Sequence, residues 1–371
     1  MKKLSVLQIC TNSGRAGAPK HVTSLARTLK SDVNFTYIFG EYASIAADLR
    51  AQHETVFIVN GLKSSISPFR DIFVFYELVK LIKLTKPDLV HCHSTKAGLL
   101  GRLAARWCGI PSVYTVHGWG WRGMKFPNNF LVVISEFFAR LINIKSFFIF
   151  VDPVSLSAAK YFLIPLHQKE LILNGTEDSA LGLFEFKRVN PNVLTLGMAA
   201  RVDRAKDHDT LFDSLCKIEF DFRLFLCGAG TDSDVFKEYV ELNFSNIFDK
   251  IVFLGELSDI ESFYRSIDVN LLISKFEALP LSLIEGSSFS KPTIATDTGG
   301  VSKVVHDGVN GFLIQPGASL ELAGRLRDIN NDSRLLEFAK NSRVIYEKYF
   351  SVDLMANKVL DIYRKISNDA K

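Results

Sequence analysis

The chain has 371 residues, 47% of them hydrophobic and 23% charged, which predicts a globular protein of two domains and excludes fibrous and disordered chains. Its net charge of +4 hides an asymmetry, because residues 1–175 contain 21 Lys+Arg and 10 Asp+Glu, a net of +11, and the remainder carries a net of −7. The basic half favours a polyanion or an anionic membrane as partner, although a random surface imbalance gives the same count.

Strands and helices alternate from the beginning of the chain. Apolar runs rich in β-branched or aromatic residues predict buried strands at Leu4–Cys10, Asn34–Phe39, Thr55–Val59, Leu89–His93, Val113–His117 and Ser146–Val151. Helical spacing predicts helices at His21–Lys30, Phe69–Thr85, Gly98–Cys108 and Asn129–Asn143. Because strands that alternate with helices form βαβ units, we expect a mostly parallel sheet covered by helices on both faces.

The same pattern restarts in the second half. Strands are predicted at Leu194–Ala199, Phe222–Cys227, Ile251–Leu254, Val269–Ile273, Thr293–Thr296 and Gly311–Ile314, with helices at about 208–218, 231–243, 258–267, 281–289, 301–306 and 319–330. Asn174–Asn192 has the composition of a linker. The sequence therefore predicts an α/β protein of two doubly wound Rossmann-like domains, over residues 1–175 and 176–351. A terminal helix over 352–367 follows both, and the pattern leaves open whether it packs back on the first domain.

Cysteine usage and hydropathy indicate the compartment. Five scattered cysteines without a CxxC pair predict reduced thiols in a reducing compartment. His91-Cys92-His93 resembles a metal-binding group, but the sequence shows no second group of ligands, so we expect no metal. The first ten residues imitate a signal peptide but are interpreted as a first strand, and no uncharged apolar run reaches the ~18–20 residues that span a bilayer. We expect a cytoplasmic protein, soluble or peripheral on the inner face of the cell membrane.

Two loops that follow predicted strands are candidates for binding phosphate. Doubly wound domains bind ligands beyond the carboxyl ends of their strands. Gly14 and Gly17, after the first strand, let backbone amides approach a ligand at a helix start, although a GxxG turn is also common for structural reasons alone. Arg201 and Lys206, after Leu194–Ala199, are spaced to converge on one diphosphate. A solvated basic loop is the alternative.

The most informative segment is SKFEALPLSLIEG, residues 274–286, which follows the strand Val269–Ile273. Pro280 suits the first turn of a helix, which puts Glu277 in the entering loop and Glu285 in the first or second turn. Ionised carboxylates in these positions accept hydrogen bonds from ribose or sugar hydroxyls, and amides at the helix start bind phosphate oxygens. Two unrelated surface glutamates, the alternative, fit badly with an apolar helix start led by proline.

These motifs occur together and in order. Glu277-x7-Glu285, the pair Arg201 and Lys206, Gly14-x-x-Gly17 and Asn174-Gly175-Thr176 resemble the signature of the large retaining glycosyltransferase family of bacterial polysaccharide and lipid-linked glycan synthesis, over nearly the whole chain. The segments 91–97, 101–106 and 114–118 resemble members that extend polyprenyl-diphosphate-linked glycans. The resemblance implies the GT-B fold, two doubly wound Rossmann-like domains facing each other across a cleft. Ala200 stands where the family usually has glycine, and Asp152 lies where a serine usually ends a strand.

The resemblance also implies a role for each matching position. Arg201 and Lys206 are expected to hold the donor diphosphate, Glu285 the ribose hydroxyls and Glu277 the hydroxyls of the transferred sugar. The implied donor site is completed by Gly14, Gly17, Gly228, Gly230, Ala278, Leu279, Pro280 and Leu281. The implied catalytic residues are His117, near the transferred sugar, with Glu277, Arg201 and Lys206, and the implied acceptor contacts are His93 and Lys96.

The implied reaction is retaining transfer of a hexose or N-acetylhexosamine from a nucleotide diphosphate sugar, first of all a UDP-sugar, to a glycan or polyprenyl-diphosphate-linked acceptor. No carboxylate is assigned as a nucleophile, so we expect same-face substitution in which the leaving diphosphate accepts the acceptor's proton. Cationic side chains are expected to neutralise that diphosphate without a metal or other cofactor.

An anionic membrane surface is expected to be a further partner. Lys80, Lys83 and Lys86 lie near one amphipathic helix. The first half is also rich in aromatic residues further on, at Phe126, Phe130, Phe137, Phe138, Phe147 and Phe148. Basic amphipathic surfaces bind anionic bilayers, although the alternative, that most of these aromatic residues are core, remains open.

Other classes of protein share parts of this pattern. A GT-B nucleotide-sugar epimerase or a non-catalytic nucleotide-binding protein would use the same architecture. A dinucleotide-binding oxidoreductase is disfavoured because the first turn lacks GxGxxG. A nucleic-acid binder would suit the basic half, but the chain has no recognised motif of that class, so we expect no nucleic-acid partner.

Overall fold

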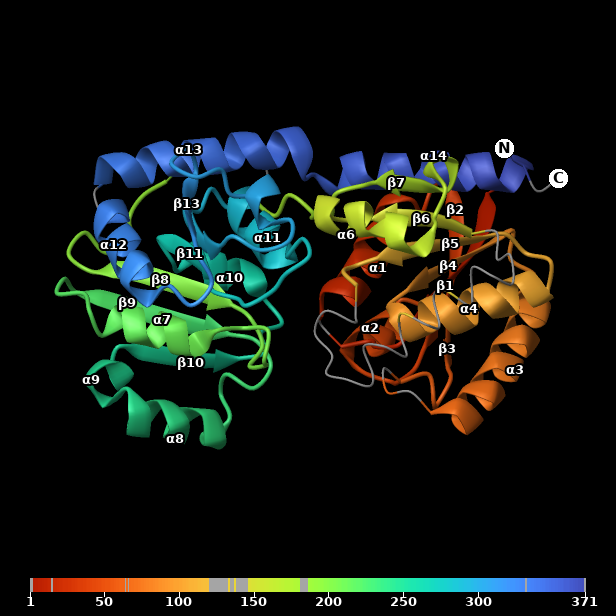
Figure 1. The fold of residues 1–371 in the computed structure, drawn as a ribbon, viewed down its shortest axis with the longest axis horizontal. Helices are drawn as coiled ribbons and strands as arrows, with labels where there is room; N and C mark the ends of the chain where they lie inside the picture. Colours follow the sequence, from red (N-terminus) through yellow and green to blue (C-terminus); the bar gives the residue numbers. More distant parts are fainter. Residues whose placement is uncertain are drawn as a thin grey trace. The chain divides into compact units, whose positions relative to one another are not determined.

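The computed structural model describes residues 3–14, 16–63, 65, 67–119, 133, 137, 146–180, 186–330 and 332–369. The chain divides into two compact units: unit 1 is Met1–Gly175 with Val352–Lys371, and unit 2 is Thr176–Ser351. Each unit is a parallel sheet with helices on both faces (Figure 1). The predicted helix at Asn129–Asn143 lies almost wholly outside the described residues.

The sheet of unit 1 has seven strands in the order β3-β2-β1-β4-β5-β6-β7, and every neighbouring pair is parallel. The strands are β1 (Leu4–Cys10), β2 (Val33–Phe39), β3 (Thr55–Ile58), β4 (Leu89–His93), β5 (Ser112–Val116), β6 (Ser146–Phe150) and β7 (Lys169–Leu171). Side chains of a strand alternate between its two faces, so Val6 packs on one side of β1, and Leu7 and Ile9 pack on the other.

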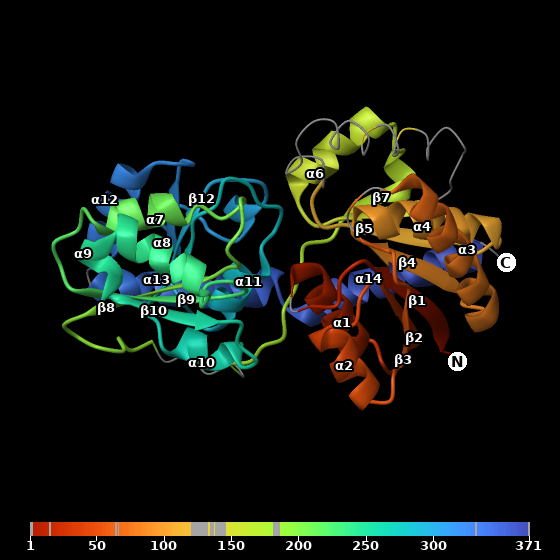
Figure 2. The same cartoon turned by 90° about the horizontal axis from the view of Figure 1, so that it is seen from below.

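Two helical layers cover this sheet. The described helices of unit 1 are α1 (Gly17–Thr28), α2 (Ser44–Ala51), α3 (Pro68–Thr85), α4 (Thr95–Trp107), α6 (Pro153–Ala158) and α14 (Val352–Asp369), with the 3₁₀ turns η2 (Ala159–Phe162) and η3 (Leu166–Gln168). Helices α3 and α4 pack with the Leu7 side of the sheet, and α1 and α14 pack with the Val6 side. Figure 2 shows α1 and α14 on the face opposite α4. The terminal helix is therefore part of unit 1, although it follows unit 2 in the sequence.

Unit 2 has a six-stranded parallel sheet in the order β10-β9-β8-β11-β12-β13. Its strands are β8 (Leu194–Ala199), β9 (Phe222–Cys227), β10 (Ile251–Gly255), β11 (Val269–Leu272), β12 (Thr293–Thr296) and β13 (Gly311–Ile314). Its described helices are α7 (His208–Leu215), α8 (Asp234–Asn243), α9 (Ser245–Phe248), α10 (Ile260–Arg265), α11 (Leu281–Ser288), α12 (Ser319–Ile329) and α13 (Asp332–Tyr349), with the 3₁₀ turn η4 (Val301–Lys303). Figure 2 shows α7 and α12 on one side of the sheet and α10 and α11 on the other.

Candidate functional site

Four loops of unit 2 meet beyond the carboxyl ends of β8, β9, β11 and β12. The amide of Val202 donates to the carbonyl of Ala229, joining the loops after β8 and β9, at 2.9 Å. Lys275 N donates to the Ala205 carbonyl at 2.8 Å, and Gly300 N to that of Ala278 at 2.6 Å. These bonds place the predicted donor residues of this unit along one edge of a sheet, where parallel α/β sheets bind ligands.

The centre of this edge is an ion pair between Lys206 and Glu277, whose side chains are 14% and 11% exposed. The two residues come from different loops, and the backbone bridge between Lys206 and Ser274 brings those loops side by side. A lysine ammonium has three N–H donors and no acceptor, so Lys206 can hold Glu277 and still donate to an anionic ligand. The pair thus offers a cation and a hydroxyl-binding carboxylate at one place.

Arg201 does not share this partner. Its guanidinium pairs with Asp203, and the Arg201 side chain is 60% exposed. Burial alone would raise the pKa of Asp203, but hydrogen bonds from Arg201 and from the amides of Ala205 and Lys206, with the charge of Arg201, lower it below its usual value. Asp203 therefore stays ionised and organises the loop that carries both predicted diphosphate ligands.

Glycine is needed where these loops approach one another. Gly228 has φ of +129°, and a Cβ there would lie 2.5 Å from the carbonyl oxygen of Ala200. Gly299, with φ of +59°, would place a Cβ 2.0 Å from the carbonyl oxygen of Glu277. Gly230 also has a positive φ, of +86°, beside Val202. The predicted Gly228 and Gly230 are thus required by the backbone of the loop beside Arg201.

The acidic segment has the predicted local structure, with one difference. Pro280 is the N-cap of α11 and lies just before the helix rather than in its first turn. Glu277 lies in the entering loop and Glu285 on α11, where its carboxylate accepts a hydrogen bond from the Tyr264 hydroxyl at 3.2 Å. Of the other predicted donor residues here, Leu279 is buried and Ala278 and Leu281 are half-buried.

The glycine turn of unit 1 lies at the carboxyl end of β1. Gly14 N donates to Oδ1 of Asn12 at 2.5 Å, and Gly17 is the first residue of α1. Ser13 holds the neighbouring chain, because its hydroxyl donates to the Glu41 carbonyl and its carbonyl accepts from Ile45 N, both at 2.8 Å. The donor-binding role of Gly14 and Gly17 stays a prediction.

The predicted catalytic His117 lies in a buried polar network that begins on the terminal helix. The Tyr363 hydroxyl of α14 is 2.5 Å from Nδ1 of His91 and 3.3 Å from Nε2 of Gln8. Oε1 of Gln8 is 2.7 Å from Nε2 of His93, and Nδ1 of His93 is 3.0 Å from Nε2 of His117. Burial lowers the pKa of His91, His93 and His117 well below 6.5, so all three are neutral at pH 7.

His21 of α1 completes this group. Its Nδ1 lies 3.1 Å from Oδ1 of Asn174, and its ring meets that of His117 edge-on with the centroids 4.8 Å apart. Burial lowers the pKa of His21 to about 4, although the hydrogen bond to Asn174 opposes that shift. Asn174 belongs to the predicted family signature, whereas His21, Gln8 and Tyr363 were not predicted.

The two predicted acceptor contacts are both engaged within unit 1. His93 is fully buried and has a partner at each ring nitrogen. The ammonium of Lys96 lies 2.6 Å from Asp71 and also donates to the Ser65 carbonyl, and its side chain is 8% exposed. Their role toward an acceptor stays a prediction, and an acceptor group at Lys96 would have to compete with Asp71.

The aromatic residues proposed as a lipid surface divide into three groups. Phe147 and Phe148 are buried in the core of unit 1, as the alternative interpretation held. Phe137 is 43% exposed. Phe126, Phe130 and Phe138 lie outside the described residues.

Asp152, which stands where the family usually has a serine, caps a helix. Its carboxylate accepts a hydrogen bond from Ser155 N at 2.8 Å at the start of α6.

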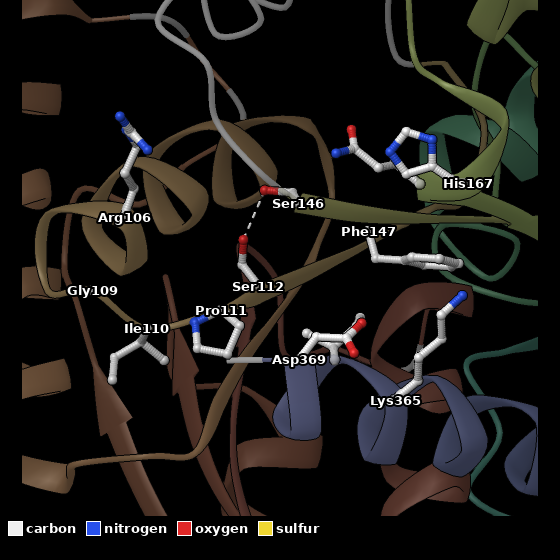
Figure 3. Close-up of a pocket in the computed structure, with 12 residues that line it drawn as sticks. Arg106, Gly109, Ile110, Pro111, Ser112, Ser146, Phe147, His167, Lys365 and Asp369 are labelled. Carbon is white, nitrogen blue, oxygen red and sulfur yellow. Dashed lines mark hydrogen bonds between the residues drawn. The ribbon is translucent and has the colours of Figure 1, made fainter. Parts of the chain in front are cut away.

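A hollow of about 470 Å³ lies at the opposite, amino ends of β5 and β6. Figure 3 shows Ser112 and Ser146 joined by a hydrogen bond beside it. Their hydroxyl oxygens are 2.7 Å apart, and Arg106, His167 and Lys365 also line the hollow. Parallel sheets bind ligands at their carboxyl ends, so this hollow is not the candidate site.

Metal-binding groups are few in the part of the chain that the structure describes. Two Asp-x-Asp sequences are present, at Asp207–Asp209 and Asp232–Asp234, and neither belongs to a group of three or more metal-binding side chains among the described residues. Asp207 accepts from the Thr210 hydroxyl at 2.9 Å, and Asp209 from that of Tyr239 at 2.8 Å. One group of three ligands, His21, His93 and His117, is placed to share an ion. No helix among the described residues has the length and apolar character needed to cross a membrane.

Comparison with known proteins assigns both halves of the chain. Residues 15–175 match the family described as Glycosyltransferase Family 4, and residues 183–347 match Glycosyl transferases group 1. The chain is 29% identical over 332 residues, 83% of each chain, to the UDP-Gal:α-D-GlcNAc-diphosphoundecaprenol α-1,3-galactosyltransferase of Escherichia coli. It is 24% identical, over 88% of this chain and 89% of the other, to the N,N'-diacetylbacillosaminyl-diphospho-undecaprenol α-1,3-N-acetylgalactosaminyltransferase of Campylobacter jejuni.

Solved structures agree on the fold. A glycosyltransferase from Rickettsia africae superposes with a TM-score of 0.81 at 22% identity, over 99% of both chains. The Anabaena protein HepE, solved with UDP and glucose, superposes with a TM-score of 0.78 at 19% identity, over 97% of this chain and 99% of that one. With both family matches, the parallel sheets of both units and the motifs in place, the chain belongs to the glycosyltransferases of the GT-B fold.

Proposed function

We propose that this glycosyltransferase transfers a hexose or N-acetylhexosamine from a UDP-sugar, with retention at the anomeric carbon, to a glycan or lipid-linked acceptor in bacterial surface polysaccharide or glycoconjugate synthesis. The observation that carries the proposal is the Lys206–Glu277 pair at the edge of the unit 2 sheet, because Glu277 lies on the same segment as Glu285. Uridine is supported by the UDP bound to HepE and by the UDP-sugar named for the Escherichia coli relative.

The donor site follows from the chemistry of these side chains. Arg201 supplies an exposed guanidinium, paired with Asp203, and Lys206 a largely buried ammonium, paired with Glu277, for the diphosphate oxygens. The amides at the start of α11 have no partner within the helix and favour an anion. Glu285, held by Tyr264, accepts from the ribose hydroxyls, and Glu277 accepts from hydroxyls of the transferred sugar. We assign His117 to recognition of the same sugar.

The proposed reaction is a substitution on one face of the sugar. The bond from the anomeric carbon to the β-phosphate oxygen breaks, and the bond to the acceptor oxygen forms on the same face. The departing phosphate oxygen accepts the proton of the acceptor hydroxyl. Arg201 and Lys206 stabilise the charge that grows on this diphosphate, which is the task a metal ion has in other transferases. The proposed reaction therefore needs no metal.

We assign a lipid-linked acceptor on the basis of two relatives. The Escherichia coli and Campylobacter jejuni enzymes are named for transfer to undecaprenol-diphosphate sugars, and each aligns with 83% or more of this chain.

The surface of α3 suits attachment to the membrane that holds such an acceptor. Phe69, Ile72, Phe73 and Tyr76 repeat at helical spacing and are 84%, 55%, 75% and 61% exposed. Lys80 and Lys83 continue the same face, and Lys86 ends the helix. Aromatic side chains can enter the interface while lysines meet anionic headgroups.

Nucleotide binding and sugar transfer test the assignment separately. Glu285→Ala removes hydrogen bonds to a charged group, each about 1.5–3 kcal/mol, so the Kd for UDP in calorimetry should rise roughly 10- to 100-fold. Glu277→Ala should lower transfer from UDP-sugars more than it weakens UDP binding. Glu261→Ala, which removes an exposed carboxylate paired with Arg265, is the matched control. Normal UDP affinity in Glu285→Ala would remove the ribose role, and absence of transfer with every UDP-sugar would remove the uridine assignment.

A further inference from the structure

Three histidines from separate elements of unit 1 converge on one point. His21 comes from α1, His93 from the end of β4, and His117 from the residue after β5. One ring nitrogen of each lies within 4.8 Å of those of the other two. The neighbouring His91 and Cys92 lie outside this group. His91 instead bonds the hydroxyls of Tyr363 and Thr115.

The hydrogen bonds around this group decide which nitrogens carry lone pairs. Nδ1–H of His21 donates to Oδ1 of Asn174, which leaves a lone pair on Nε2. That Nε2 is buried, and no described residue offers it a hydrogen bond. Nε2–H of His93 donates to Oε1 of Gln8, so Nδ1 of His93 also presents a lone pair, which the N–H of His117 meets at 3.0 Å.

We propose that His21, His93 and His117 bind one divalent transition-metal ion, such as Zn²⁺ or Co²⁺. Neutral imidazole is the form that coordinates metals, and a carbonyl acceptor on the opposite ring nitrogen is the usual outer contact of a metal-bound histidine. Asn174 and Gln8 provide such acceptors, and Tyr363 orients the amide of Gln8. His117, which is only half-buried, gives the ion a way in.

The site requires small movements. Zinc bonds to histidine of about 2.0–2.1 Å in a tetrahedron put the nitrogens roughly 3.4 Å apart. The proton that His117 donates to His93 from Nε2 would move to Nδ1 of the same ring, because a neutral imidazole keeps one N–H. The nitrogens, which now lie up to 4.8 Å apart, would draw together. Water would fill the fourth position. The ion is no part of the proposed transfer: by holding the His117 ring it would compete with the sugar for that residue, so the metal should inhibit.

Metal binding by the full chain tests the proposal without any assay of transfer. After removal of metals with EDTA, Co²⁺ should bind at one equivalent per chain with the visible spectrum of a tetrahedral site, and Zn²⁺ should displace it. X-ray absorption of the zinc-loaded wild type should show three imidazole nitrogens. His21→Gln and His117→Asn should abolish this binding, and Asn174→Ala should weaken it roughly 10- to 100-fold.

His208→Gln is the matched control, because His208 is also buried with a ring nitrogen that no described residue bonds, but lies in unit 2. Its cobalt affinity should equal that of the wild type. Absence of stoichiometric binding to the wild type, or fewer than three imidazoles around the zinc, overturns the proposal even if a variant fails to fold. Where transfer is observed, Zn²⁺ should inhibit it, and EDTA should not lower the rate of transfer. The binding measurements test the metal site whether or not the proposed UDP-sugar transfer is correct.

Discussion

The Lys206–Glu277 pair shows how single residues of unit 2 depend on one another. Both side chains are largely buried, so removing one leaves the other charge without its partner in a poorly solvated place. Sequence motifs supplied both residues but not the contact, because the two lie 71 positions apart and only the folded loops bring them together. Arg201, paired with Asp203 and mostly exposed, is free of that constraint.

This difference leads to a prediction for Arg201 and Lys206, the two proposed diphosphate ligands. Arg201→Ala and Lys206→Ala should each lower kcat/KM for transfer by about 10²- to 10³-fold, the size of effect seen when one preorganised donor to a developing charge is removed. Only Lys206→Ala should also lower the free energy of unfolding, because it strands Glu277. Steady-state kinetics and urea denaturation measure the two effects.

Two control variants test whether the loss of any positive charge in unit 2 has the same effect as a loss at the candidate site. Arg265→Ala and Lys217→Ala break exposed ion pairs with Glu261 and Asp213 elsewhere in unit 2. Both should keep transfer and stability close to wild type, since exposed pairs contribute about 0–1 kcal/mol. If Arg201→Ala and Lys206→Ala retain activity within a few-fold of these controls, neither side chain stabilises the leaving diphosphate.

At the scale of elements, the buried strands were predicted most accurately. β1, β4, β8, β9, β12 and β13 have the predicted bounds, because strands buried on both faces are continuous apolar runs bounded by loops. The helices α2, α6, α9 and α13 and the strand β7 were not predicted. Three of the helices and β7 are short. Helix α13 is long and buries residues at helical spacing, among them Leu335, Ala339 and Tyr346, so its signal was present in the sequence. The predicted helix at 301–306 is a single 3₁₀ turn.

The terminal helix was predicted as a helix, but its contacts were not. Tyr363 reaches His91 across 272 positions of sequence, and no local pattern encodes that distance. Its hydroxyl contacts both His91 and Gln8 in the core of unit 1. Helix α14 is thus attached to the first unit by buried polar contacts as well as by the apolar side chains of Met355, Val359 and Ile362.

Loss of the Tyr363 hydroxyl should therefore destabilise unit 1. Tyr363→Phe leaves buried polar atoms of His91 and Gln8 without this partner, which should lower the free energy of unfolding by about 1–3 kcal/mol. Tyr349→Phe, on α13 of unit 2 and 44% exposed, is the matched control and should change it by less than about 0.5 kcal/mol. Urea denaturation followed by circular dichroism measures both, and equal stabilities would show that apolar packing alone holds α14.

At the scale of the whole molecule, charge follows the division into units. With the terminal helix included, unit 1 has 25 Lys+Arg and 13 Asp+Glu, a net of +12, and unit 2 has 19 and 27, a net of −8. The charge asymmetry of the sequence is therefore a difference between two folded bodies. The basic body also carries the exposed apolar face of α3, and a surface both basic and apolar is suited to an anionic bilayer.

Vesicle binding decides whether unit 1 uses that face. Each lysine near an anionic surface contributes about 1 kcal/mol, so Lys80→Glu, Lys83→Glu and Lys86→Glu together should weaken sedimentation with anionic vesicles by at least about 100-fold. The double change Phe69→Ser and Phe73→Ser should also weaken vesicle binding, because it removes aromatic side chains that would enter the bilayer interface. Added salt should weaken the contribution of the lysines more than that of the aromatic residues. Lys303→Glu and Leu320→Ser, exposed positions of unit 2, are matched controls that should bind like the wild type. Equal recovery with neutral and anionic vesicles at low salt would contradict the membrane assignment and leave transfer to an acceptor in solution.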